Sequence, residues 1–207
     1  MTAFLIVLAV AAEAYLLGSV DTGILVSKYL YHDDVRTHGS GAAGMTNMLR
    51  TFGKKAAALT AVGDVLKGVV AVCLGRWLFG HLPADAAVSP YLGVYLAAIL
   101  AVVGHSKPIY FGFKGGKAVA TSIGVLIPLA FWQLLIAVCI CLFLIWRSGF
   151  VSLGSLALVT AMPILLALSG KFGLLPLSLI ILALVFWSHR ENIRRLAKGE
   201  EKTWIKK

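Results

Sequence analysis

The sequence predicts an all-α, polytopic integral membrane protein with seven transmembrane helices, an external N-terminus and a cytoplasmic C-terminus. Three observations predict this class: 59% of the 207 residues are apolar, only 14% are charged, and the mean hydropathy is +0.90. Soluble domains contain about 45–50% apolar and about 25% charged residues, so an ordinary soluble enzyme is excluded. The three cysteines lie in apolar runs without metal-ligand spacing, which indicates buried thiols and gives no metal or cofactor site.

Seven apolar stretches account for the predicted crossings, because one crossing needs about 20 apolar residues. They are residues 3–20, 56–79, 91–111, 118–130, 131–146, 151–168 and 172–188. The fourth and fifth stretches form one apolar run interrupted near Pro128, so hydropathy alone allows either one kinked helix or two short ones. The first stretch lacks a basic leader and a small-residue cleavage site, which favours a retained span over a signal peptide.

The distribution of positive charge favours the seven-span alternative. With seven spans, residues 21–55, 105–117, 147–150 and the tail after Trp187 share one side. These segments contain every Lys and Arg except Lys67, Arg76 and Lys171. Because positively charged loops stay in the cytoplasm, this side is predicted to be the inner one. The net charge of +10 therefore orients the spans and is not a nucleic-acid-binding surface.

The first cytoplasmic loop predicts an anion site. Its glycines allow tight turns that bring backbone N–H groups towards an anion: Gly39, Gly41 and Gly44. A helix predicted from about Met45 would present the unpaired N–H groups of its first turn to a phosphate. Asn47, Arg50 and Lys54 would share one face of that helix. On the glycines alone, a flexible loop explains the segment equally well, and the anion site is favoured once the polar residues are added: Ser40, Thr46, Asn47 and Arg50.

The second cytoplasmic loop offers a second phosphate site in Lys114-Gly115-Gly116-Lys117, which opens a helix that carries Thr121. It is not a nucleotide-binding P-loop, because the G-x-x-x-x-G-K-[ST] pattern is absent. Contact with lipid headgroups explains these lysines nearly as well. His105 is either a general base or a structural histidine.

The third loop and the tail add a few polar candidates. Ser152 and Ser155 stand near a helix start, where a serine usually caps the helix. His189 and Asn192 are i, i+3 neighbours, and Glu191 can pair with Arg195 at i, i+4.

Two ionisable residues lie inside the second span, one helical turn apart. Charged groups at membrane depth are costly and are candidates for function. Asp64 and Lys67 can neutralise each other, so a structural ion pair and a proton relay both explain them.

Taken together, these motifs resemble one family. The resemblance rests on ordered segments that cover almost the whole chain: Gly18-Ser19, Asp34–Gly41, Thr46–Arg50, Asp64–Gly68, Gly104-His105, Phe113–Thr121, Val151–Ser155 and His189–Ile193. The sequence strongly resembles the bacterial acyl-phosphate-dependent glycerol-3-phosphate acyltransferases, the PlsY family.

This resemblance implies a seven-span fold in which residues 1–207 form a single membrane-embedded acyltransferase domain. The implied reaction moves an acyl group from acyl phosphate to the 1-hydroxyl of glycerol 3-phosphate, giving lysophosphatidic acid and phosphate without a cofactor. The implied partners are these two substrates, the lipid bilayer and, functionally, the enzyme that produces acyl phosphate. The implied location is the bacterial inner membrane, with the active site facing the cytoplasm.

The resemblance also assigns residue roles. Ser40 and Arg50 match the catalytic first motif, Gly115, Gly116 and Lys117 match the glycerol-3-phosphate loop, and Glu191 matches a structural position. By the same resemblance, three residues of the third loop and the tail line the active site: Ser152, His189 and Asn192. The expected catalytic residues are therefore Ser40, Arg50, Lys117, His189 and Asn192. The expected substrate-binding residues are Gly39, Gly41, Thr46, Asn47, His105, Lys114, Gly115, Gly116 and Ser152. The proton acceptor is left open between His189, His105 and a substrate phosphate oxygen.

The sequence departs from the family pattern at four positions, none of which is an expected catalytic residue: Asp21 for Pro, Ala42 for Asn, Lys107 for an aromatic residue and Ala118 for Gly. Two other functions are compatible with the composition. A transporter for phosphorylated solutes would line a path with charges, and only Asp64 and Lys67 qualify. A lipid-binding scaffold would explain the charges but not the ordered Ser, Asn and His residues.

Overall fold

The computed structural model describes residues 2–82 and 89–204, and within these ranges all regular structure is helical. The elements in chain order are α1 (Thr2–Ser19), α2 (Thr22–Leu30), η1 (Val35–Thr37), α3 (Met45–Phe52), α4 (Lys54–Phe79), α5 (Pro90–Ser106), η2 (Ile109–Phe111), α6 (Val119–Ser148), α7 (Val151–Leu168), η3 (Phe172–Leu174), α8 (Leu175–Ser188) and α9 (Arg190–Ala197). The chain divides into an N-terminal unit, residues 1–129, and a C-terminal unit, residues 130–207. Of the predicted cytoplasmic tail, Lys206 and Lys207 lie outside the described residues.

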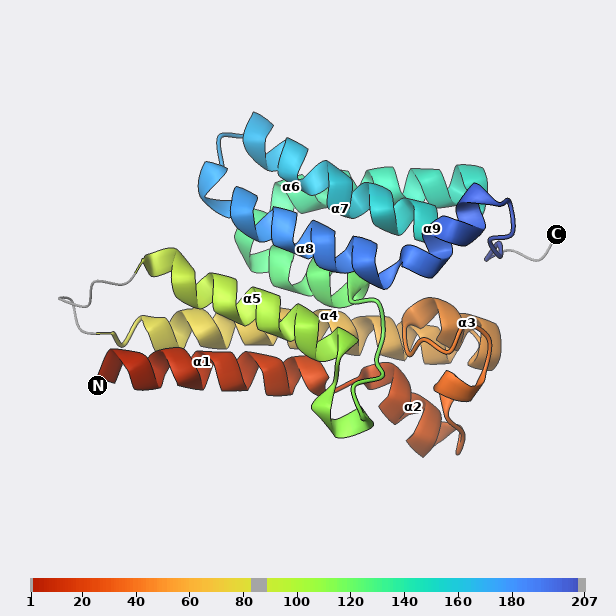
Figure 1. The fold of residues 1–207 in the computed structure, drawn as a ribbon, viewed down its shortest axis with the longest axis horizontal. Coiled ribbons are helices and arrows are strands. Elements are labelled where there is room, and N and C mark those ends of the chain that lie inside the picture. Colours follow the sequence, from red (N-terminus) through yellow and green to blue (C-terminus); the bar gives the residue numbers. More distant parts are fainter. Residues whose placement is uncertain (1, 83–88, 205–207) are drawn as a thin grey trace. The chain divides into compact units, whose positions relative to one another are not determined.

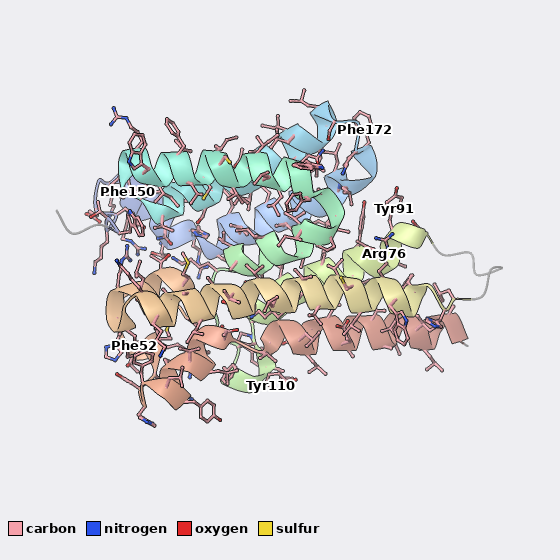
Figure 2. The ribbon with its side chains drawn as sticks, turned by 180° about the vertical axis from the view of Figure 1, so that it is seen from behind. Phe52, Arg76, Tyr91, Tyr110, Phe150 and Phe172 are labelled. Carbon is pink, nitrogen blue, oxygen red and sulfur yellow. The ribbon has the colours of Figure 1, made fainter. Side chains whose placement is uncertain are left out.

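In the N-terminal unit, α1, α4 and α5 pack side by side (Figure 1). Small residues allow this close approach, as between membrane helices generally. A Cβ atom on Gly18 would overlap the backbone of Ala101, and one on Gly104 would overlap the backbone of α1 at Tyr15 and Ser19. Figure 2 places Phe52 at one end of this unit, and Arg76 and Tyr91 at the other.

Two short helices, α2 and α3, pack against the first turns of α4. Asp21 caps α2, because its side chain accepts a hydrogen bond from the Ile24 amide. The two helices enclose a small core under the first loop: Ile24, Val26, Val35, Ala43, Met48 and Ala56. The sequence predicts α3 correctly from Met45 but does not predict α2, which lies in the segment assigned to a loop. Helix α3 ends at Phe52, so the predicted common face with Lys54 is wrong: Gly53, with φ of +86°, breaks the helix and Lys54 begins α4.

In the C-terminal unit, α7 and α8 pack against each other, and α9 follows α8 after a bend of 64°. The later part of α6 packs on α7, where Gly154 lies against Ile145 and the Cys141 carbonyl. Phe150, at the start of α7, and Phe172, in η3, mark opposite ends of this unit (Figure 2).

The described helices confirm an all-α integral membrane protein. Four of them are long and apolar enough to cross a membrane, and the number rises to six if each of two bent pairs is one span. Helix α7 has the predicted bounds, residues 151–168. The predicted fourth and fifth stretches lie in α6, which is interrupted at Ala130, where φ is −150° and ψ is 51°.

The side chains of α4 show how such a helix is adapted to lipid. Its exposed face is apolar at helical spacing: Leu59, Val62, Leu66, Val70 and Leu74. Its buried face carries the polar side chains of Thr60, Asp64 and Lys67. This pattern is the reverse of a soluble amphipathic helix and is the one expected for a helix surrounded by hydrocarbon.

Candidate active site

The first loop is organised around the side chain of Asn47, which is only 2% exposed. Its Nδ2 atom donates to the carbonyl oxygens of Val35, His38 and Ala42, each at 3.0 Å. Its Oδ1 atom accepts from the backbone amide of Ser40 at 3.2 Å. The loop therefore closes around one side chain, and Ser40 is held at its exposed edge.

Two glycines make this closure possible. Gly39 and Gly41 adopt φ of +58° and +70°, in the left-handed region that glycine favours. Gly39 also lies so close to Asn47 Oδ1 that a Cβ atom would overlap it. The glycines proposed for anion binding thus also shape the loop that presents Ser40.

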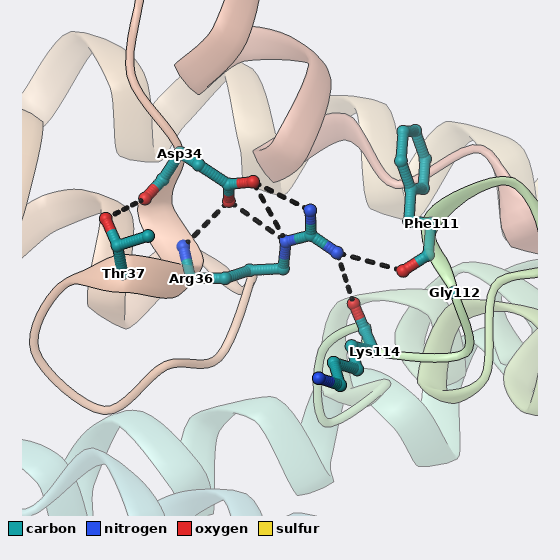
Figure 3. A pocket seen from close by; sticks show the side chains of 6 residues that line it. All are labelled: Asp34, Arg36, Thr37, Phe111, Gly112 and Lys114. Atoms are coloured by element: carbon teal, nitrogen blue, oxygen red, sulfur yellow. Dashed lines mark hydrogen bonds and ion pairs between the residues drawn. The ribbon is translucent and has the colours of Figure 1, made fainter.

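Arg36 joins the first loop to the second (Figure 3). Its guanidinium donates to the Asp34 carboxylate at 2.7 to 3.2 Å, to the Phe111 carbonyl at 2.9 Å and to the Lys114 carbonyl at 3.5 Å. The hydrogen bonds from Arg36 lower the pKa of Asp34 to about 2, so the pair stays charged. A hollow of about 440 Å³ lies beside this bridge, lined by Asp34, Arg36, Thr37, Phe111, Gly112 and Lys114.

The glycines of the second loop rest on His105, which is 2% exposed. The Gly116 amide donates to the His105 carbonyl at 3.1 Å, and a Cβ atom on Gly116 would overlap Nε2 of the imidazole ring. A Cβ atom on Gly115 would likewise overlap the His105 carbonyl. The absence of side chains at 115 and 116 therefore lets the loop lie directly on His105.

A buried ammonium holds His105 from the other side. Lys67 Nζ donates to His105 Nδ1 at 2.8 Å and to the Val20 carbonyl at 2.9 Å, and lies 3.0 Å from Asp64 Oδ1. The predicted neutralisation of Asp64 by Lys67 is confirmed. With Lys67 in its charged form, which can only donate, Nδ1 of His105 would be the acceptor in this contact.

Among the described residues, this cluster contains the group of side chains best suited to bind a metal ion. Ligand atoms of Asp21, Asp64 and His105 lie within 4.8 Å of one another. Lys67 contacts two of these three groups, so a positive charge already stands where a cation would bind. Within the described residues, Asp21 Oδ2 is buried without a hydrogen-bond partner.

In the C-terminal unit, the predicted residues Ser152 and Asn192 meet at Glu201. Glu201 Oε1 accepts from Ser152 Oγ at 2.8 Å and from Asn192 Nδ2 at 2.6 Å, and Oε2 accepts from Arg195 Nε at 2.8 Å. Ser152 therefore does not cap α7, whose N-cap is Phe150 without a side-chain cap bond.

The tail corrects one predicted ion pair. Glu191 pairs with Arg194 at 3.1 Å, and Arg195 turns instead towards Glu201. Both arginines lie in the last turn of α9, so the i, i+3 partner reaches Glu191 while the next residue faces the returning tail.

His189 stands at the bend between α8 and α9 and is 3% exposed. Its Nδ1 lies 2.9 Å from the Val185 carbonyl oxygen. Because a carbonyl only accepts, Nδ1 carries the proton and Nε2 is the basic nitrogen of the neutral ring.

The predicted site residues thus fall into two groups. The N-terminal unit contains the two loops from Gly39 to Arg50 and from His105 to Lys117, which Arg36 ties together at one end. The C-terminal unit contains Ser152, His189 and Asn192. Sequence reasoning missed Arg36, Glu201 and the donor role of Arg195. Only Arg36 had a usable local signal, the acidic residue two positions before it.

Fold and site define a class: a multi-pass, all-α membrane protein with glycine-rich loops held by buried polar side chains. A family model described as glycerol-3-phosphate acyltransferase matches residues 7–199. The chain therefore belongs to the glycerol-3-phosphate acyltransferase family.

Similar proteins match this chain over nearly its full length. A glycerol-3-phosphate acyltransferase of Lawsonia intracellularis is 51% identical over 191 residues, which cover 92% of each chain. One of Clostridioides difficile is 40% identical and covers 93% of each chain. The crystal structure of PlsY (YgiH), an integral membrane glycerol 3-phosphate acyltransferase in its glycerol 3-phosphate form, matches with a TM-score of 0.85 and 34% identity over 95% of this chain and 94% of that one. Its lysophosphatidic acid form matches with a TM-score of 0.82 and 32% identity, again over 95% and 94%. The chain is of the PlsY type.

Proposed function

We propose that this chain transfers an acyl group from acyl phosphate to the 1-hydroxyl of glycerol 3-phosphate, releasing lysophosphatidic acid and phosphate. Family membership makes it a glycerol-3-phosphate acyltransferase. The PlsY forms with glycerol 3-phosphate and with lysophosphatidic acid supply the acceptor and the product by likeness. The single structural observation that carries the proposal is the joining of two glycine-rich, basic loops by Arg36.

The chemistry of the donor explains why such loops suffice. An acyl phosphate is a mixed anhydride with a good leaving group, so no covalent enzyme nucleophile is required. The hydroxyl oxygen attacks the carbonyl carbon, the bond to the phosphate oxygen breaks, and the hydroxyl proton leaves to a base. Positioning of two bound reactants contributes about 7–11 kcal/mol. Donors aimed at the charge that develops on the carbonyl oxygen supply much of the rest.

The proposed binding roles follow the loops. Backbone amides around Ser40, with Gly39 and Gly41, bind the acyl phosphate together with the Arg50 guanidinium, which matches a phosphate as a bidentate fork. Lys117, Lys114 and the amides of Gly115 and Gly116 bind glycerol 3-phosphate. Thr46 adds a hydroxyl in the first turn of α3, and Asn47 holds the loop in shape.

The ring contacts of His105 and His189 bear on which group accepts the hydroxyl proton of glycerol 3-phosphate. His105 Nδ1 lies 2.8 Å from Lys67 Nζ, and this contact supports a role for His105 in holding the second loop in preference to accepting the proton. The proposed acceptors are therefore His189, whose Nδ1 is held by the Val185 carbonyl, and a phosphate oxygen of the substrate. The variant His189→Gln decides between them. If His189 is the base, the variant loses the lower limb of the pH–rate profile as well as rate. If the substrate phosphate is the base, that limb persists.

We also propose that residues 1–207 act as one domain with seven spans, an external N-terminus and an active site on the cytoplasmic side of the inner membrane. The interruption of α6 at Ala130 supports two spans within residues 118–146, and the distribution of basic residues supports the orientation. A membrane-impermeant thiol reagent tests this on inverted vesicles, with single cysteines at positions 40 and 76 in a cysteine-free background. Labelling at 40 and protection at 76 is expected, and the opposite result overturns the orientation.

The activity itself is tested with purified protein, an acyl phosphate and glycerol 3-phosphate, by following phosphate and lysophosphatidic acid. Product is expected only with both substrates, and Arg50→Ala and Lys117→Ala should abolish it. Arg76→Ala is the matched control, because Arg76 lies at the other end of the N-terminal unit (Figure 2). Uptake of glycerol 3-phosphate into sealed vesicles without acyl product would support a transporter instead.

A further inference from the structure

The loop between α5 and α6 lies against the last turn of α1. Tyr15 Oη donates to the Lys107 carbonyl at 2.8 Å, and the Ile109 amide donates to Ser19 Oγ at 3.4 Å. Helix α1 has 18 residues. At about 1.5 Å per residue it is nearly as long as the hydrocarbon core of a bilayer is thick, about 30 Å. The end of α1, and with it residues 107–109, therefore lies at the boundary between hydrocarbon and headgroups.

This loop exposes large apolar side chains. Ile109, Tyr110 and Phe113 are each about half exposed, and Leu16 and Val20 at the end of α1 are exposed as well. Tyr110 lies at the outer edge of the N-terminal unit (Figure 2). A contiguous apolar patch of this kind marks an interaction surface, and aromatic side chains at the end of a spanning helix are typical of the headgroup region.

The last turn of α2 repeats the combination of a lysine with exposed apolar side chains. Lys28 is followed by Tyr29 and Leu30, and all three are exposed. The Lys28 ammonium lies 3.8 Å from the Asp34 carboxylate, and Arg36, the partner of Asp34, donates to the backbone of the loop after α5. The Asp34–Arg36 pair therefore brings the two lysine-containing segments to the same part of the N-terminal unit.

We call these side chains the interfacial surface: Lys28, Tyr29, Leu30, Lys107, Ile109, Tyr110 and Phe113. Within residues 2–82 and 89–204, the ammonium of Lys107 has no hydrogen-bond or ion-pair partner. A lysine at this depth can lay its carbon chain on apolar groups and extend its charge into the headgroup layer. An anionic headgroup neutralises such a charge, whereas a zwitterionic headgroup brings no net charge to it.

We propose that the interfacial surface binds the headgroups of anionic phospholipids. Lys107 and Lys28 contact the negatively charged headgroup, and Ile109, Tyr110 and Phe113 contact the upper part of the acyl chains. A second copy of this chain fits the surface less well, because it would bring lysines towards lysines. None of these residues is assigned to catalysis or to substrate binding, so the inference does not depend on the proposed function.

The test measures lipid binding by the purified full chain in a neutral detergent, titrated with phosphatidylglycerol or with phosphatidylcholine. Native mass spectrometry gives the apparent Kd of the first lipid bound, and wild type should bind phosphatidylglycerol more tightly. Lys107→Gln should weaken that binding by about fivefold, since a basic residue near an anionic surface contributes about 1 kcal/mol. It should leave binding of phosphatidylcholine unchanged. Tyr110→Ala should weaken binding of both lipids, because it removes apolar contact area.

The matched control is Lys55→Gln, which neutralises an exposed lysine of the same unit that is followed by three alanines and no aromatic residue. It should leave both affinities nearly unchanged. Equal wild-type affinity for the two lipids would overturn the proposal. Equal losses in Lys107→Gln and Lys55→Gln would also overturn it, because they would show only a diffuse attraction by net charge. A change from dimer to monomer caused by Tyr110→Ala would show that a second copy covers the surface, and would overturn the proposal as well.

Discussion

Replacing Asn47 should damage the first loop in a way that depends on the chemistry of the replacement. Its buried amide contacts three carbonyl oxygens and one backbone amide, but Nδ2 has only two hydrogens, so the side chain makes about three full hydrogen bonds. At about 1 kcal/mol each, the loop gains about 3 kcal/mol from them. Asn47→Ala should therefore lower kcat/KM by up to about 100-fold, because about 1.4 kcal/mol corresponds to a factor of ten.

Asn47→Asp should be the more damaging of the two changes. It keeps the shape and the acceptor for the Ser40 amide, but it presents a carboxylate oxygen to three carbonyl oxygens at 3.0 Å. Even when protonated, the substituted carboxyl group would supply one hydrogen for three acceptors. The order of activity should be wild type, then the alanine variant, then the aspartate variant.

Two measurements check this order: initial rates with both substrates, and the rate of trypsin cleavage after Arg36, which rises as the loop opens. Met45→Ala is the control, because it changes a side chain that is 40% exposed in the same helix. An aspartate variant as active and as resistant as wild type, or less impaired than the alanine variant, refutes the reasoning.

Three further changes probe the supports of the second loop. Lys67→Met leaves the buried Asp64 carboxylate unpaired and should cost about 3–5 kcal/mol. The melting temperature in detergent should fall, and Asp64→Asn in the same chain should restore part of it; no recovery would contradict the pairing. The pKa of Asp34 lies at about 2, below its usual 3.8, so the pair stabilises the fold above about pH 4 and loses this effect as the pH falls towards 2. Melting between pH 5 and pH 2 should show this slope, and Arg36→Gln should flatten it; an unchanged slope would refute the assignment. Gly116→Ala places Cβ against His105 and should raise KM for glycerol 3-phosphate by about tenfold, since about 1.4 kcal/mol of strain suffices; an unchanged KM would show that the loop does not bind it.

The long apolar elements were predictable because hydropathy over about 20 residues is a local signal. Helix α7 has the predicted bounds, and α4 begins two residues before its prediction. Helix α2 was not predictable in this way, because its nine residues are too short for a span. Its stability comes from packing on α4 and from the Asp21 cap.

Some site residues could likewise be predicted from the sequence, and others could not. Glycines beside basic residues indicated both loops, and the predicted start of α3 at Met45 is correct. The partners of Asn47 were not predictable, because all four contacts join residues five to twelve positions away in an irregular loop. Glu201 lies 49 positions from Ser152, and nothing in the local sequence distinguishes it from the neighbouring Glu200.

In each unit, buried or partly buried polar residues hold the loops or the other site residues in place. Asn47 and Arg36 in one unit donate hydrogen bonds to loop backbone, the His105 carbonyl accepts one from the Gly116 amide, and Glu201 in the other unit orders side chains. Two anionic substrates are best stabilised by dipoles that need no rearrangement during the reaction, because reorganisation subtracts from the binding energy. Glycine loops supply amides but no rigidity of their own. The rigidity must then come from neighbours that do not touch substrate. Substitutions at these supporting residues should therefore change rate through loop order, while substitutions at Arg50 and Lys117 change it through direct charge.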